Sequence, residues 1–193
     1  MARKREFDPA QALDKAMAIF WDKGYADTTM DDLVDVTGVS RYGLYGTFGN
    51  KRELFTAALD RYAAQMALQR QTALRRPGAG LAEIRRFFDG IVQMVGTPTA
   101  MRGCMLCNTA TEVAAHDAGI ARTVRGHLDD LANAFAQALQ NARDNGDLDA
   151  NVDPARTARC LTGLMQGGAV MIRAGYDRNY LKRYFVTALD ALL

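Results

Sequence analysis

The chain has 193 residues, of which 49% are hydrophobic and 24% are charged, and this composition predicts a packed, soluble core. No apolar run approaches the roughly 18 residues that a membrane span needs, and the N-terminal MARKREFD has no apolar segment behind its charges, which argues against a signal peptide. The net charge is only +2, and residues 1 to 56 carry eight Lys or Arg against nine Asp or Glu, so composition alone does not indicate a nucleic-acid-binding domain.

Apolar residues recur at helical spacing along almost the whole chain, and no segment reads convincingly as a strand. We count nine helices and predict an all-α fold. The first helix is capped by Asp8, has Pro9 at its first position and ends at Gly24. The second, TTMDDLVDV, is short and is capped by Thr28 or Thr29.

The segment TGVS joins the second and third helices as a tight turn. Gly38 supplies the left-handed residue that closes one helix, and Ser40 caps the next. The third helix runs from about Arg41 to Phe48. Asn50 then caps a long fourth helix that extends to about Arg75.

The segment RRPGAG is the clearest boundary in the chain. We expect later helices at residues 81–95, within 103–117, from about 120 to the segment DNGD, from 154 after the cap Asp153, and at 179–193, with GTPTAMR as a loop. The predicted organisation is an N-terminal domain at residues 1–53 and a C-terminal domain at residues 54–193.

Two short helices joined by a four-residue turn with a glycine describe a helix-turn-helix. The third helix is short and polar, and its Arg41, Tyr42, Tyr45 and Thr47 cannot all face a core, which suits insertion into a major groove. Gly43 costs helix stability, and we interpret it as allowing close approach of the backbone to a phosphate or a base edge. The alternative is a glycine required where this helix crosses the first one.

Other residues of the same region suit phosphate contacts. The Tyr45 hydroxyl can reach a phosphate while its ring packs, and Lys51 lies in the first turn of the fourth helix, where backbone N–H groups also favour an anion. Arg3, Lys4 and Arg5 form either a basic arm along the duplex or a solubilising tail.

The segment TTMDDLVDVTGVSRYGLYGTFGNKRELF resembles the DNA-binding segment of the tetracycline-repressor (TetR) family. The residues that carry the resemblance are Thr28, Thr29, Gly38, Val39, Ser40, Leu44, Tyr45, Phe48, Lys51, Leu54 and Phe55. The resemblance implies a dimeric, all-helical transcriptional repressor. Its first three helices would bind double-stranded DNA, and the other six would bind a small-molecule effector and the second subunit.

The resemblance also assigns roles to residues, and the cap Ser40 is counted with them. Phosphate contacts fall on Thr29, Tyr45 and Lys51, and base-reading positions on Arg41, Tyr42 and Gly43. At the positions of Tyr42 and Gly43, family members commonly have a small residue followed by Ser, Thr or Asn. Because this chain differs there, the resemblance does not predict the half-site sequence.

Cys104 and Cys107 lie three residues apart on one helical face. A sensing thiol needs a lowered pKa and access, which Arg102 and the adjacent helix N-terminus would help to supply. The alternative is that these two and Cys160 are small buried hydrophobic residues. An odd number of cysteines also argues against a disulfide framework and favours the cytoplasm.

The segment RGCMLCNTATE is similar to a Gly-Cys-Leu-x-x-Asn-x-x-x-Glu stretch of a TetR subgroup. Some members of that subgroup use a cysteine at the position of Cys104 to sense oxidants or electrophiles. The match covers Gly103, Cys104, Asn108 and Glu112, with Met105 at the leucine position.

Methionine and phenylalanine side chains supply adaptable apolar surface for an effector, although most of them are expected to be ordinary core. The candidate ligand- or redox-sensing residues are Cys104, Cys107, Phe88, Met105, Phe135 and Met165.

The segment CLTGLMQGGAVMIRAG places Gly163 and Gly167 one turn apart, with Gly168 beside them. Small residues on one face let two helices pack closely, so we predict that this helix and the last one form a two-fold, four-helix dimer interface. The alternative is a glycine-kinked helix near a pocket.

The favoured interpretation is a cytoplasmic, dimeric DNA-binding repressor, released by a small hydrophobic ligand or by cysteine modification. We expect no catalytic residues, cofactor or metal; Glu112 and His116, four residues apart, have too few partners for a metal site. Two alternatives remain: a small helical thiol-dependent oxidoreductase that uses Cys104 and Cys107, and a helical adaptor that binds only protein.

Overall fold

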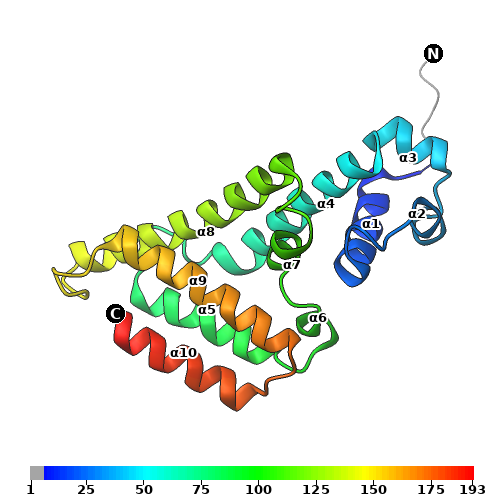
Figure 1. The fold of residues 1–193 in the computed structure, drawn as a ribbon. Helices are drawn as coiled ribbons and strands as arrows, with labels where there is room; N and C mark the ends of the chain where they lie inside the picture. The colour runs from blue at the N-terminus through cyan, green and yellow to red at the C-terminus, as the bar shows by residue number, and fades with distance from the viewer. Residues whose placement is uncertain (1–6) are drawn as a thin grey trace. The chain divides into compact units, whose positions relative to one another are not determined.

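The computed structural model describes residues 7–193, and every regular element within them is a helix, which confirms the predicted fold class (Figure 1). The chain divides into two compact units. The first comprises Asn108–Val124 and the described part of Met1–Ala64, and the second comprises Gln65–Cys107 and Arg125–Leu193.

The helices of the first unit begin with the side-chain caps that the sequence predicts. They are α1 (Pro9–Lys23), α2 (Met30–Thr37), α3 (Arg41–Phe48) and α4 (Lys51–Met66), the last of which ends in the second unit. Asp8 Oδ1 accepts from the Ala10 N–H at 2.9 Å, and Asn50 Oδ1 accepts from the Glu53 N–H at 3.0 Å. Each cap satisfies an amide that has no partner inside its helix.

The turn between α2 and α3 has the geometry of a helix-turn-helix. Gly38 is left-handed, with φ 72° and ψ 14°, a conformation that a side chain disfavours. Leu33 of α2 and Leu44 of α3 are buried and anchor both helices in the core of this unit.

The second unit is built from the remaining helices, of which α7 and α8 each have one end in the first unit. They are η1 (Ala67–Gln71, a π-helix), α5 (Leu81–Met94), α6 (Pro98–Met101), α7 (Met105–Glu112), α8 (Ala118–Asp144), α9 (Pro154–Arg173) and α10 (Arg178–Leu192).

Three helix boundaries differ from those expected. The regular α-helix expected to reach Arg75 ends at Met66 and continues as η1 and turns. The expected loop GTPTAMR contains α6, because the Thr97 hydroxyl caps a single turn that begins with proline. The helix containing Glu112 ends there, and Asp117 caps α8 by accepting from the Gly119 and Ile120 N–H groups, so His116 is not on the helix of Glu112.

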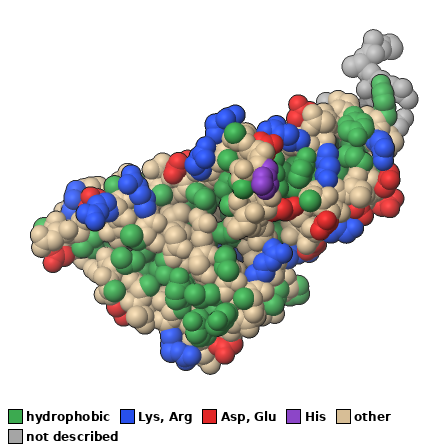
Figure 2. Space-filling model, in the orientation of Figure 1, with side chains coloured by type: hydrophobic (Ala, Val, Ile, Leu, Met, Phe, Trp, Pro, Cys, Tyr) green, Lys and Arg blue, Asp and Glu red, His purple; other side chains and the backbone are tan. Residues whose placement is uncertain are grey.

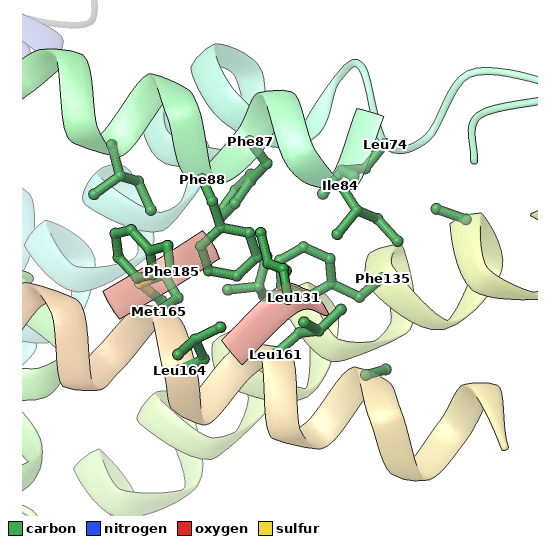
Figure 3. Close-up of a cluster of buried hydrophobic side chains, with 14 of the residues drawn as sticks. Leu74, Ile84, Phe87, Phe88, Leu131, Phe135, Leu161, Leu164, Met165 and Phe185 are labelled. Atoms are coloured by element: carbon green, nitrogen blue, oxygen red, sulfur yellow. The ribbon is translucent and has the colours of Figure 1, made fainter. Parts of the chain in front are cut away.

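An aromatic cluster forms the core of the second unit (Figure 3). Phe135 of α8 packs against both Phe87 and Phe88 of α5, with ring centroids 5.0 and 5.8 Å away, and Phe185 of α10 lies 5.0 Å from Phe88. Gly168 of α9 allows Phe185 to approach, because a Cβ at residue 168 would collide with that ring. Within residues 7–193, none of the helices is both long enough and apolar enough to span a bilayer.

Candidate nucleic-acid interface

The third helix presents one buried and one exposed side, as a recognition helix requires. The Ser40 hydroxyl accepts from the Gly43 N–H at 3.2 Å and so fixes the start of α3. Leu44 is buried, whereas Arg41, Tyr42 and Tyr45 are exposed, with Tyr42 87% accessible. An aromatic side chain this exposed contributes little to the core and is accessible to a partner surface.

Gly43 has a packing reason, as the alternative interpretation of this glycine allowed, although its neighbours differ from those expected. A Cβ at this position would lie 2.9 Å from Val39 Cγ1 and 3.4 Å from Phe7 Cε1. The missing side chain therefore points toward protein atoms, which favours a packing role at this position. The contacts come from the preceding turn and from the residue before the cap of α1 rather than from a crossing of α1 itself.

Arg41 is paired with an acid of the preceding helix. Its Nη2 lies 2.7 Å from Oδ1 of Asp31, which belongs to the first turn of α2. Both side chains are more than half exposed. The Arg41 guanidinium is therefore already hydrogen-bonded through Nη2 to Asp31 in the absence of DNA.

Thr29 and Asp32 form a reciprocal cap at the start of α2. The Thr29 hydroxyl accepts from the Asp32 N–H at 3.0 Å, and Asp32 Oδ2 accepts from the Thr29 N–H at 2.9 Å. A hydrogen bond from Lys23 and those from Thr29 lower the pKa of Asp32 to about 2. The exposed Thr29 hydroxyl also donates to Asp32, so binding a phosphate would require it to exchange this partner.

Lys51 rests on an aromatic side chain. Its Nζ lies 4.5 Å from the centroid of the Tyr25 ring, a cation–π distance. The Tyr25 ring in turn lies 4.8 Å from that of Phe55, which is fully buried. This stack restricts the lysine and holds its ammonium group near the start of α4.

Two carboxylates from residues 108–124 bind groups that are adjacent in sequence to Tyr25 and Lys51. Glu112 Oε1 accepts from the N–H of Ala26 at 2.7 Å, next to Tyr25. Asp117 receives two hydrogen bonds from Arg52, at 2.5 and 2.7 Å, next to Lys51. The Arg52 hydrogen bond, with those from the α8 amides, holds the pKa of Asp117 well below its usual range.

The candidate sensing cysteines are less accessible than a sensing thiol requires. Cys104 and Cys107 are both buried, and the Cys107 thiol donates to Gln166 Oε1 at 3.3 Å. A hydrogen bond with Cys104, reinforced by burial, raises the pKa of Cys107. Cys160, by contrast, is exposed on α9, so the expectation that all three cysteines could be buried is wrong for this one.

The other candidate ligand residues are also buried. Phe88, Phe135 and Met165 belong to the core cluster of the second unit (Figure 3). Met105 lies outside that cluster and is 1% exposed. These side chains currently contact one another or their neighbours, which is the ordinary core arrangement that the sequence also allowed.

Several residues of this region were not predicted from the sequence. Asp31, Asp32, Tyr25, Arg52 and Asp117 were given no role in the interface. Their ion-pair and cation–π partners lie between nine and 65 residues away in the sequence, so spacing alone could not pair them. Arg3, Lys4 and Arg5, proposed as a basic arm, lie outside the described residues.

Two family profiles match the chain. Residues 12–58 match the family described as bacterial regulatory proteins, tetR family, and residues 80–188 match the tetracyclin repressor-like C-terminal domain. The second match alone covers more than half of the chain.

Individual relatives agree with these matches over the whole length. The uncharacterized HTH-type transcriptional regulator YezE of Bacillus subtilis (strain 168) is 33% identical over 193 residues, covering all of both chains. The HTH-type transcriptional repressor ComR of Escherichia coli (strain K12) is 30% identical over 97% of this chain and 90% of its own. The TetR family regulator CifR, solved as a cysteine mutant complexed with 26bp double-strand operator DNA, has the same fold, with a TM-score of 0.87, 24% identity and complete coverage of both chains.

Proposed function

The chain belongs to the TetR family of bacterial regulatory proteins, and we propose that it binds a pseudo-palindromic operator as a homodimer and represses transcription until an effector releases it. The observation that carries this proposal is the exposed face of α3, where Arg41, Tyr42 and Tyr45 project from a helix whose start is fixed by Ser40. The repressor named ComR, 30% identical over most of both chains, supports the direction of regulation. As a regulator of bacterial DNA, the protein would act in the cytoplasm.

We assign base reading to the first residues of α3 and phosphate binding to the groups around them. Arg41 can donate to base edges in the major groove, and Tyr42 offers a ring and a hydroxyl. Thr29, Tyr45 and Lys51 would bind phosphates, with Lys51 presented by the Tyr25 ring.

The second copy would bind along α9 and α10. Hydrophobic side chains gather over these two helices (Figure 2), and the exposed ones include Val170, Tyr176, Tyr180 and Val186. Gly163 is exposed, with nothing within 4 Å of a Cβ built there, which leaves room for a partner helix. Gly167 and Gly168 have a partner within the chain, because a Cβ on either would crowd Tyr184 or Phe185 of α10.

Selection of bound duplexes from a random pool tests the proposed function. A two-fold dimer predicts an inverted repeat whose half-site centres lie about 34–36 Å apart, roughly one turn of B-DNA. A monomeric protein, or a pool without enrichment, would reject operator binding. The adaptor alternative predicts no enrichment and no dependence on Arg41, Tyr45 or Lys51.

Replacing Lys51 with alanine tests the phosphate assignment. Loss of one phosphate contact should weaken binding to all duplexes and flatten the slope of log affinity against log salt by about one unit. Fluorescence anisotropy at several salt concentrations measures the slope. Lys15→Ala, on α1, removes the same charge as a control and should leave the salt slope almost unchanged. If the slope is also unchanged in Lys51→Ala, Lys51 does not bind a phosphate.

The effector would act on the second unit, either as a small apolar compound or by modifying Cys104 or Cys107. Operator affinity should be measured with hydrogen peroxide and with a panel of small hydrophobic compounds, in the parent protein and in Cys104→Ser and Cys160→Ser. If peroxide still releases Cys160→Ser from operator DNA but no longer releases Cys104→Ser, Cys104 is the sensor. Both family matches describe regulators, so the thiol-oxidoreductase alternative is not supported.

A further inference from the structure

The ion pair between Asp31 and Arg41 joins the two helices of the helix-turn-helix at its exposed edge. Asp31 occupies the first turn of α2 and Arg41 the first position of α3, so the pair spans the turn between them. The N–O distance of 2.7 Å is that of a charge-assisted hydrogen bond. An exposed pair of this kind adds little to folding, which directs attention to its effect on binding.

An arginine at the start of a recognition helix has two competing targets on a duplex. Phosphate oxygens attract it strongly but carry no sequence information. The O6 and N7 atoms of guanine accept two parallel hydrogen bonds from the same guanidinium and distinguish one base pair from the others. The direction in which the side chain is held before contact influences which target it reaches.

Asp31 is placed to influence that choice. It occupies Nη2 of Arg41, and its negative charge disfavours phosphate oxygens on the same side of the guanidinium. The neighbouring acid, Asp32, is already engaged by Lys23 and by the Thr29 cap. Asp31 is therefore the acid of this turn that holds Arg41.

We propose that Asp31 is a specificity-determining positioning residue, which holds Arg41 away from phosphates and directs it toward a guanine edge. This inference rests on the proposed DNA binding by α3. Asp31 need not touch the bases itself, because it acts through the orientation of Arg41. Its removal should improve binding to unrelated DNA while reducing discrimination.

The test compares two duplexes: the sequence that the parent protein enriches from a random pool, and the same duplex with both half-sites scrambled. In Asp31→Asn we expect tighter binding to the scrambled duplex. The ratio of specific to scrambled affinity should fall by at least about three-fold, because the variant loses part of the discrimination that one bidentate arginine provides. The salt slope on the scrambled duplex should steepen by up to about one unit, because Arg41 gains a phosphate contact. Asp31→Glu, which can restore the pair, should recover most of the ratio.

Two further variants separate positioning from charge. Asp35→Asn removes the same charge from an exposed position one turn further along α2, and it should change both affinities by a similar factor. In an Arg41→Ala background, Asp31→Asn should no longer change the ratio. Any one of three results would overturn the inference. The affinity ratio could stay unchanged in Asp31→Asn, it could fall equally in Asp35→Asn, or it could still fall in Asp31→Asn when Arg41 is absent. Absence of any enriched sequence for the parent protein would instead reject the proposed function.

Discussion

The first four helices and the helices around the aromatic cluster both use side-chain caps, since Asp153 and Asp177 cap α9 and α10, but they differ in whether the side chains of interest are exposed or buried. α1, α2, α3 and α4 each begin with a side-chain cap that closes within three residues, and the proposed DNA contacts lie at the start of α2, on the exposed face of α3 and at the start of α4. In the second unit, rings from α5, α8 and α10 meet in one core. Substitutions on the exposed face of α3 should therefore alter DNA binding without altering stability, and substitutions in the ring cluster should lower stability.

The largest expected difference is between Phe135 and Tyr42. Phe135→Ala removes a fully buried ring that contacts two others and should lower the free energy of unfolding by about 3–5 kcal/mol. Tyr42→Ala removes an exposed ring and should change that free energy by less than about 0.5 kcal/mol while altering sequence preference. Urea denaturation and duplex binding measure the two quantities. Equal loss of stability in both variants would contradict the comparison.

Glycines on helices of the second unit offer a smaller contrast. Gly168→Ala would push a methyl group into the Phe185 ring and should lower the free energy of unfolding by about 1–3 kcal/mol. Gly90 is exposed on α5 and has nothing within 4 Å of its missing Cβ, so Gly90→Ala should raise that free energy by up to about 1 kcal/mol. Changes of opposite sign in the free energy of unfolding, measured by denaturation at one protein concentration, would show that packing around each glycine decides the effect of the added methyl group. Two changes of the same sign would contradict it.

Local chemistry explains which parts of the fold could be predicted from the sequence. The caps at Asp8, Ser40 and Asn50 and the left-handed Gly38 were expected correctly, because each depends on residues within a few positions of it. The π-helical stretch after Met66 was not expected, since apolar spacing does not distinguish it from an α-helix.

The interface was predicted only in part for the same reason. The exposure of Arg41, Tyr42 and Tyr45 follows from the amphipathic pattern of one short helix. The pairing of Arg41 with Asp31 depends on how the turn brings two helices together, and the contact of Glu112 with Ala26 joins segments 86 residues apart. Burial of Cys104 and exposure of Cys160 likewise depend on packing rather than on local sequence.

Tyr25 should affect DNA binding by a modest amount, although it was not among the predicted DNA-binding residues. Tyr25→Leu removes the ring beneath Lys51, and loss of this half-buried cation–π contact should weaken binding to specific and scrambled duplexes alike by about two- to five-fold. Tyr25→Phe keeps the ring and should bind as the parent protein does. Equal weakening in the two variants would show that the hydroxyl, not the ring, matters.

The smallest expected effect is the acid dependence of the α2 cap. The pKa of Asp32 is about 2 in the folded protein, below the ordinary value of about 3.9 that it regains on unfolding. Because the folded pKa is the lower one, the stabilisation from this carboxylate is complete above about pH 4 and is lost as the pH falls from about 4 to 2. Asp32→Asn should therefore reduce the change in thermal midpoint across that window, and Lys23→Gln, which removes the principal hydrogen bond, should do so in part. If Asp32→Asn loses as much stability as the parent between pH 4 and pH 2, the cap does not contribute to the acid sensitivity of the fold.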